Sequence, residues 1–294
     1  MTKPDNSPNI VICWELGGGL GHLVKGAMLA RRLLERSCTV SFAVRDLASA
    51  HPLLPEDHYC LVQAPYFDGQ LHDWAPPADY AELLLHAGWG QASGLQARVR
   101  GWRGLFDALN ADLIIADHSP TAVLAARTQG TPCVQWGHGF GVPTRPWPVF
   151  RTWEPTPVER LAQVRQHVLT TVNAVLGQFG EPGLDAPDQL LNTAACFLTT
   201  WPELDHYPDR GSADYCGPLW PAGIGEVPWA VDSALPRIFA YLRPNLPGLP
   251  AVIRALAALD ADVLVHLSDR SGLELATTTL DRLRFTDRLI DIHA

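Results

Sequence analysis

The sequence has few charged residues, and no part of it is rich in lysine or arginine. Charged residues make up 18% of the 294 positions, and the formal net charge is −9. Proteins that bind nucleic acid usually carry a basic patch or stripe, so this composition argues against nucleic acid as a partner. Hydrophobic residues, at 47%, are frequent enough to build a real core, which argues against a disordered chain.

The sequence also shows neither the apolar centre of a signal peptide at its first residues nor a long apolar run. Its first nine residues, MTKPDNSPN, are polar, whereas a secretory signal needs an apolar centre. No apolar run approaches the roughly 20 residues that a membrane-spanning helix requires. These features predict a soluble, cytoplasmic protein, and they leave peripheral contact with a membrane open.

Cysteine is sparse and scattered along the chain. The six cysteines form no Cys-x-x-Cys pair and no cluster with the spacing of metal ligands. Because paired or clustered cysteines are the usual signals of redox and zinc sites, we expect reduced, mostly buried thiols and no bound metal.

The amino-terminal part of the chain has the pattern of a βαβ unit. Residues Asn9–Trp14 form a short apolar run suited to a buried parallel strand. A glycine-rich loop over residues 17–21 follows, and apolar residues then recur at helical spacing from His22 to Arg36. A second strand-like run, Thr39–Val44, completes the unit, which predicts a right-handed crossover and a parallel sheet.

The same alternation continues to about residue 216. Helical periodicity in residues 80–109 is interrupted by Gly88, Gly90 and Gly94. Further strand-like runs lie at residues 59–62, 112–116, 132–135 and 195–199, and further helical patterns at 121–129 and 158–179. We therefore predict an α/β fold, with a doubly wound, Rossmann-like parallel-sheet domain over residues 1–216.

Residues 217–236 have the composition of an interdomain linker, with four prolines and three glycines. The α/β pattern then restarts, with strands expected at 237–242 and 262–267 and helices at 247–259 and about 273–281. We predict a second, incomplete α/β domain over residues 237–294. A domain of this size is thin for a doubly wound sheet, and an exposed sheet edge favours self-association.

The glycine-rich loop at residues 17–21 fits neither of two common nucleotide-binding patterns. The dinucleotide pattern Gly-x-Gly-x-x-Gly needs a third glycine where this chain has His22 or Val24, depending on the first glycine chosen. A Walker loop needs Gly-Lys followed by Ser or Thr, whereas Lys25 here precedes Gly26. An NAD(P)-dependent Rossmann enzyme is therefore the weaker alternative.

A histidine at the mouth of the loop suggests a different use. Ligands of parallel α/β sheets bind at the carboxyl ends of the strands, and His22 follows the first of these ends. An ordinary imidazole has a pKa of about 6.5 and can accept a proton at neutral pH. A buried structural histidine is the alternative.

Several segments, taken in order, carry a resemblance to a known family. They are WELGGGLGH (Trp14–His22), the helical LARRLL, Val44–Asp46, ADLIIAD (Ala111–Asp117), GHGF (Gly137–Phe140) and DYCGPLW (Asp214–Trp220). These segments resemble GT-B fold glycosyltransferases, most closely the bacterial relatives of the UDP-glucuronosyl and UDP-glucosyltransferases. The resemblance covers essentially the whole chain, although no single motif is very specific.

The resemblance implies a catalytic pair. In that family the loop histidine is the general base that deprotonates the acceptor hydroxyl, and an aspartate near the end of a later strand orients it. The matching residues are His22 and Asp117, and a carboxylate behind an imidazole fixes its tautomer and stabilises the imidazolium. Capping of the next helix is the alternative role for Asp117, and His118 and His138 are rival bases.

The resemblance also implies the substrates. The donor is a nucleotide-diphospho-sugar with a UDP or dTDP carrier, the acceptor is a small-molecule or lipid-like alcohol, and transfer inverts the anomeric carbon without a further cofactor. Six residues are expected to contact substrate: Gly19, Gly21, His118, His138, Phe140 and Trp147. For the aromatic residues of the loop from Gly137 to about Pro157, packing beneath a long loop is an equal alternative.

One part of the family pattern is not found. Relatives hold the donor diphosphate with a His and Gly cluster at a helix N-terminus and the sugar with an acidic pair, and residues 284–291 resemble the segment just before that region. We therefore expect a truncated donor-binding half and weak transfer by this chain alone. A non-catalytic GT-B-like helper or binding protein is the alternative, and the sequence identifies neither the sugar nor the acceptor.

Overall fold

The chain folds into two compact units, Met1–Leu219 and Trp220–Ala294. The computed structural model describes residues 7–54, 58–69, 76–153, 155–219, 229, 234–267, 282–287 and 290. Among these residues, no helix has both the length and the apolar character needed to cross a membrane.

The larger unit is built on a seven-stranded sheet in which all neighbouring strands run parallel. The strands are β1 (Asn9–Trp14), β2 (Thr39–Val44), β3 (Cys60–Gln63), β4 (Leu113–Asp117), β5 (Cys133–Gly137), β6 (Ala195–Leu198) and β7 (Asp214–Tyr215). Their order is β3-β2-β1-β4-β5-β6-β7, which confirms the predicted doubly wound sheet. The order reverses between β1 and β4, so the ends of these strands form the topological switch point where ligands of such sheets bind.

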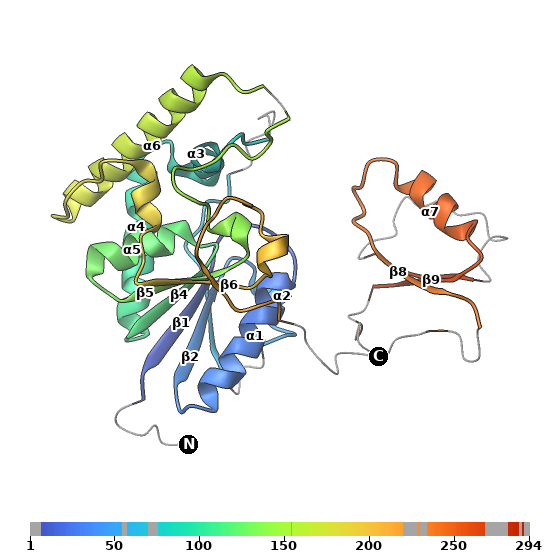
Figure 1. Cartoon of the computed structure of the whole chain (residues 1–294). Helices are drawn as coiled ribbons and strands as arrows, with labels where there is room; N and C mark the ends of the chain where they lie inside the picture. The colour runs from blue at the N-terminus through green and yellow to red at the C-terminus, as the bar shows by residue number, and fades with distance from the viewer. Residues whose placement is uncertain are drawn as a thin grey trace. The chain divides into compact units, whose positions relative to one another are not determined.

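Helices cover both faces of this sheet (Figure 1). On one face, α1 (Gly21–Leu34) and α2 (Leu47–Ala50) pack over Ile10 and Ile12 of β1. On the other face, α4 (Ala92–Ala108) and α5 (Pro120–Gln129) pack over Val11 and Cys13. Because β1 is buried on both sides, its sequence is a continuous apolar run instead of an alternating one. The long helix α6 (Val158–Gln178) contacts α4 and α3 (Tyr80–Leu84).

Short helical turns join these elements. They are η1 (Leu85–Trp89), η2 (Gly139–Gly141), η3 (Pro187–Leu191) and η4 (Pro202–Leu204). In the π-helical turn η1, Gly88 has a φ of 79°, a left-handed conformation that favours glycine and ends the regular helix. Gly94, in contrast, lies inside α4, so the predicted interruption there is wrong. The packed face of α4 outweighs the low helix propensity of one glycine, and this face comprises Leu95, Val99, Trp102 and Phe106.

The expectation of mostly buried cysteines is also wrong. Two of the six are buried, two are half-buried, and Cys60 and Cys216 are exposed, and all six are free thiols. The exposed positions follow from the topology. Cys60 begins the edge strand β3, and Cys216 comes directly after β7 at the other edge.

In the residues of the smaller unit that the structure describes, a parallel three-stranded sheet of order β10-β9-β8 is accompanied by one helix. Its elements are β8 (Arg237–Tyr241), α7 (Leu249–Ala257), β9 (Asp262–His266) and β10 (Leu283–Thr286). Leu249 and Ile253 of α7 belong to the same buried cluster as Val263 and Val265 of β9. The helix expected at 273–281 and most of the expected linker lie outside the described residues.

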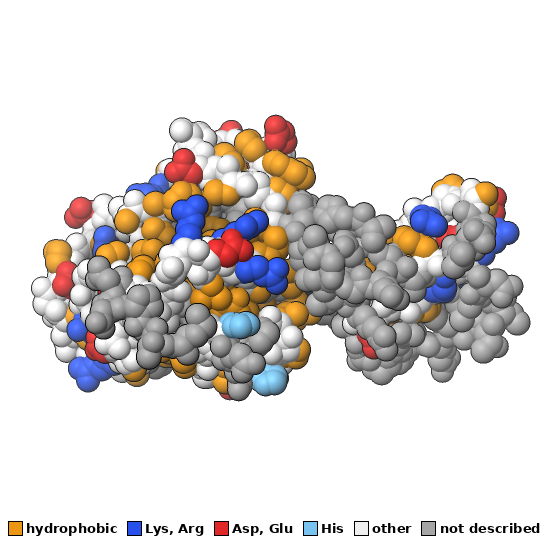
Figure 2. Space-filling model, turned by 90° about the horizontal axis from the view of Figure 1, so that it is seen from below, with side chains coloured by type: hydrophobic (Ala, Val, Ile, Leu, Met, Phe, Trp, Pro, Cys, Tyr) orange, Lys and Arg blue, Asp and Glu red, His pale blue; other side chains and the backbone are white. Residues whose placement is uncertain are grey.

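Figure 2 shows one face of the molecule with side chains coloured by type. Among the described residues on that face, lysine and arginine side chains occur in small groups beside acidic and hydrophobic ones.

Candidate active site

The loop after β1 places His22 in the first turn of α1, beside the end of β4. The Leu16 N–H donates a hydrogen bond of 2.9 Å to the His118 carbonyl, which joins the loops that follow β1 and β4. Gly17 has a φ of 84°, and a Cβ there would lie only 3.0 Å from His22 Nε2. Glycine is therefore needed at this position both for its backbone conformation and for the close approach of the imidazole.

His22 and Asp117 form the expected pair. Nδ1 of His22 lies 2.9 Å from Oδ2 of Asp117, and Trp14 and Asp117 are register partners across β1 and β4. The His22 ring stacks on the Trp14 ring with centroids 5.2 Å apart. An ionised carboxylate only accepts, so the hydrogen bond assigns the proton to Nδ1 and leaves Nε2 as the nitrogen that can accept a proton. The predicted proximity is confirmed, while the catalytic roles remain predictions.

The capping alternative for Asp117 is wrong, because another carboxylate performs that task. The N-cap residue of α5 is Ser119, and it makes no side-chain cap bond. The Thr121 N–H instead donates to Glu15 Oε2 at 2.8 Å, and the Thr121 hydroxyl donates to Glu15 Oε1 at 2.5 Å. The fully buried Glu15 therefore satisfies the start of α5 and leaves Asp117 for the site.

A buried lysine also contacts Asp117. The Nζ of Lys25 lies 2.8 Å from Oδ1, and only 5% of the lysine side chain is exposed. The same ammonium lies 5.0 Å from the centre of the Trp136 ring. Burial alone would raise the pKa of the Asp117 carboxyl, but Lys25 and His22 outweigh burial and hold that pKa below its usual value. Asp117 is therefore ionised at neutral pH, with both oxygens occupied.

Sequence reasoning did not identify Lys25 as a site residue. Its only signal is position: it lies three residues after His22, and residues at this spacing share one face of a helix. The motif GHGF contributes a second feature. A Cβ on Gly137 would lie 2.9 Å from Asp117 Oδ1 and 3.5 Å from Lys25 Nζ. The absence of a side chain at Gly137 is thus what allows the ion pair to form beside β5.

His118 lies next to this pair in a strained backbone conformation, with a φ of 47°. Its Nδ1 is on the same side of Gly17 as His22 Nε2, and its ring contacts Tyr80 and Phe140 at centroid distances of 6.1 and 5.8 Å. Burial, and then the nearby His22, lower the pKa of His118 to about 4. A ring of that pKa is neutral at pH 7 and is a weaker base than an ordinary imidazole, so His118 is better suited to hydrogen bonding than to proton removal.

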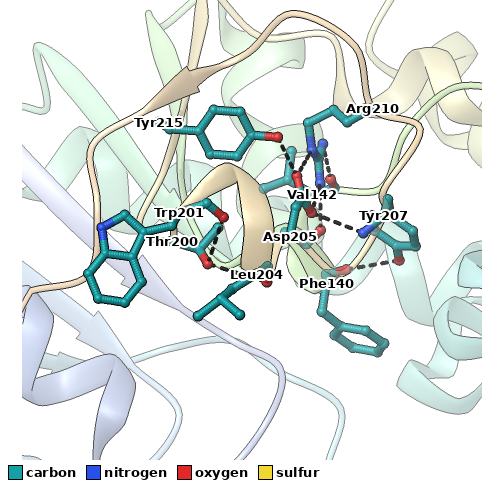
Figure 3. A network of polar contacts seen from close by, with 10 residues as sticks. Phe140, Val142, Thr200, Trp201, Leu204, Asp205, Tyr207, Arg210 and Tyr215 are labelled. Atoms are coloured by element: carbon teal, nitrogen blue, oxygen red, sulfur yellow. Dashed lines mark hydrogen bonds and ion pairs between the residues drawn. The ribbon is translucent and has the colours of Figure 1, made fainter.

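A second polar network fixes the loop that carries Phe140. Arg210 and Tyr215 both point at Asp205 (Figure 3), with donor–acceptor distances of 2.5 and 3.1 Å for the guanidinium and 2.8 Å for the phenol. Arg210 also donates to the carbonyls of Val142 and Gly139 at 2.7 and 3.1 Å. Because Asp205 and Arg210 follow β6 whereas residues 139–142 follow β5, this network joins the two loops and holds Phe140 against His118.

The other residues expected to contact substrate do not all lie together beside His22 and Asp117. Gly19 is exposed in the loop before α1, Gly21 is the exposed first residue of α1, and His138 is exposed after β5. Trp147 is buried in the core, with its ring centre 5.1 Å from that of Tyr80. The structure thus gathers His22, Asp117, His118 and Phe140 and leaves Trp147 as a packing residue behind them. No cluster of His, Cys, Asp or Glu that could hold a metal is found among the described residues.

Comparisons with known proteins identify the fold. No family model matches the sequence, and no curated protein does. The glycosyltransferase of kitacinnamycin is 18% identical with a TM-score of 0.63, over 97% of this chain and 72% of that one. The glycosyltransferase VinC, in complex with dTDP, is 16% identical with a TM-score of 0.59 over 97% and 73%. The spinosyn rhamnosyltransferase SpnG, complexed with spinosyn aglycone, is 17% identical with a TM-score of 0.58 over 94% and 70%.

These likenesses define the class of structure. The chain has a Rossmann-like α/β fold in which nearly its whole length matches glycosyltransferases of the GT-B type. The expected fold is confirmed.

Proposed function

We propose that this protein is an inverting glycosyltransferase that moves a sugar from a nucleotide-diphospho-sugar to a hydroxyl group of a small-molecule acceptor. His22 is the general base and Asp117 its orienting partner. The observation that carries the proposal is the 2.9 Å contact between His22 Nδ1 and Asp117 Oδ2, at the switch point of a sheet whose structural relatives are glycosyltransferases.

The arrangement supports a single displacement. An alcohol is a poor nucleophile until its proton is removed, and Nε2 of His22 takes that proton as the acceptor oxygen bonds to the anomeric carbon. The bond from that carbon to the diphosphate breaks on the opposite face, and the nucleotide diphosphate leaves with the electron pair. Asp117 stabilises the imidazolium that forms, and the proton then passes to solvent.

The relatives and the site surroundings support the kinds of substrate. One relative was solved with dTDP and another with a spinosyn aglycone, which favours a nucleotide-sugar donor and a small-molecule acceptor. Beside His118, the rings of Phe140 and Phe150 pack with centres 5.0 Å apart, and the ring centre of Tyr80 lies 6.1 Å from that of the imidazole. Aromatic side chains this close to the proposed base favour an apolar acceptor that presents one hydroxyl group.

A transfer assay tests the proposal. Because the chain spans 72% of the kitacinnamycin enzyme, the assay uses the chain by itself and a fusion with a complete donor-binding half of such a relative. Both are incubated with UDP- and dTDP-sugars and a panel of phenols and polyketide alcohols, and products are identified by mass. We expect glycosylated product with inverted anomeric configuration by NMR.

The opposite outcome would favour the non-catalytic alternative. Failure of both forms to make product, together with no binding of UDP or dTDP in isothermal titration, would refute the proposed function. Retention of configuration in the product would refute the single displacement while leaving sugar transfer intact.

A further inference from the structure

Lys25 is an unusual residue in this chain. Only two residues of the sequence are lysines, Lys3 and Lys25, whereas twenty are arginines. Of these cations, Lys25 is buried within the larger unit, with 4% of the residue exposed. A buried ammonium is costly unless it is paired, and Lys25 is paired with the carboxylate that contacts His22.

Two groups therefore compete to balance one buried negative charge. Asp117 is 3% exposed, so it needs a nearby positive charge. Lys25 supplies that charge at neutral pH, 2.8 Å from Oδ1. His22, 2.9 Å from Oδ2, supplies it only when protonated, and a protonated imidazole cannot act as a base. Without the ammonium, the buried carboxylate would hold a proton on His22.

We propose that Lys25 is a positioning residue of the transfer reaction, which neutralises Asp117 and so leaves the His22 ring unprotonated and able to take the acceptor proton. The sequence spacing makes this possible, because His22 and Lys25 project from adjacent turns of α1 to the two oxygens of one carboxylate. The catalytic meaning of this inference rests on the proposed function. The effect of Lys25 on His22 can nevertheless be measured without any substrate.

Other ionisable groups also act on this pair from the neighbouring strand ends. Arg45, after β2, donates to the Gly17 carbonyl at 3.0 Å. The further groups are His118 after β4 and His138 after β5, whose pKa values both respond to Lys25, His22 and Asp117. All three residues are present in every Lys25 variant, and the signals of His118 and His138 are followed in the same titration, so that a change in their own protonation is separated from that of His22.

The test is an NMR titration of the full chain labelled with ¹³C and ¹⁵N in histidine, with the His22 signal assigned from its absence in His22→Ala. Four variants are compared: Lys25→Met, Lys25→Gln, Lys25→Arg and Arg32→Met. Lys25→Met removes the charge and the hydrogen bond, Lys25→Gln keeps a donor without the charge, and Lys25→Arg keeps the charge. Arg32→Met removes an exposed cation from the same helix as a matched control, since its side chain is 78% exposed.

We expect the midpoint of His22 protonation to rise by about 1 pH unit, a roughly tenfold gain in proton affinity, in Lys25→Met and Lys25→Gln. It should stay in place in Lys25→Arg and Arg32→Met. An unmoved midpoint in a folded Lys25→Gln chain would overturn the inference, because hydrogen bonding or packing would then explain the lysine.

The wild-type chain gives an independent measurement that needs no variant. Its His22 ring should be neutral at pH 7 with the proton on Nδ1, and a doubly protonated ring at that pH would also overturn the inference.

The transfer assay separates this inference from the proposed function. Lys25→Gln should lose about tenfold in kcat/KM at pH values well below the His22 midpoint and regain most of it at pH 9, because the base is freed at higher pH. His22→Ala should not recover at any pH. If the NMR midpoint moves while neither the chain nor the fusion transfers sugar or binds UDP or dTDP, the proposed function fails and the role of Lys25 in His22 protonation stands. If His22→Ala abolishes transfer while the midpoint does not move, only the inference about Lys25 fails.

Discussion

Glu15 is predicted to make the stability of the larger unit depend on pH. Its carboxylate is fully buried after β1, where it accepts hydrogen bonds from the Thr121 N–H and hydroxyl and from the Ser119 hydroxyl. These bonds favour the ionised form, but burial is the larger effect and raises the pKa of Glu15 from 4.5 to about 7. The perturbation that tests this is Glu15→Gln, which keeps an acceptor and cannot ionise.

The magnitude follows from the pKa shift. A rise from 4.5 to about 7 corresponds to about 3 kcal/mol, at about 1.4 kcal/mol per pH unit. When folding raises the pKa of a carboxyl group, the contribution of that group to the free energy of unfolding is complete at pH values below its pKa in the unfolded state. This contribution is lost as pH rises through the pKa in the folded state. The free energy of unfolding of the wild-type chain should therefore fall by about 3 kcal/mol, relative to that of Glu15→Gln, between pH 4 and pH 8.

The assay is urea unfolding of both proteins across this pH range. The larger unit is followed by tryptophan fluorescence, because its buried tryptophans include Trp14, Trp89, Trp102, Trp136 and Trp147. Glu35→Gln on the exposed end of α1 is the matched control, and its stability relative to wild type should hardly vary with pH, because surface ion pairs contribute little. The reasoning would be refuted if the free energy of unfolding of Glu15→Gln, minus that of wild type, stayed constant or fell as pH rises.

Two further substitutions test the supports of the site. Gly137→Ala should lower kcat/KM at least about tenfold, because its Cβ would lie 2.9 Å from Asp117 Oδ1 and displace the carboxylate. The control is Gly104→Ala, where a Cβ meets nothing within 4 Å. Equal values of kcat/KM in the two variants would count against the packing argument. Asp205→Asn should destabilise the larger unit by about 3 kcal/mol in urea unfolding, because it leaves the Arg210 guanidinium, 9% exposed, without its counter-charge. A loss below about 1 kcal/mol would show that this network contributes little.

The sequence predicted the sheet well because its strands are buried on both faces. Parallel strands such as β1 and β4 contain unbroken apolar runs, at residues 10–14 and 113–116, which few other elements imitate. The four-residue α2 and the two-residue β7 were not predicted, because elements this short show no period. Similarly, η1 depends on one left-handed glycine within an otherwise helical pattern.

The candidate site was predictable only in part. His22 follows a glycine-rich loop and Asp117 ends an apolar strand, so the positions of both were visible in the sequence. Lys25 and Glu15 were not, because their partners lie 92 and 106 residues away and meet them only where β1 and β4 are neighbours. A lysine on a helix is usually solvated, and no local pattern distinguishes the rare buried one.

The central claim is that His22, held by Asp117, removes the proton of the acceptor hydroxyl. The most direct measurement is kcat/KM for sugar transfer by wild type and His22→Ala, with folding of the variant verified by circular dichroism. The account predicts a loss of about 10²–10⁴-fold, the usual contribution of a positioned base. Undiminished turnover by a folded His22→Ala protein would contradict it and would assign the base to another residue, with His118 the next to be tested.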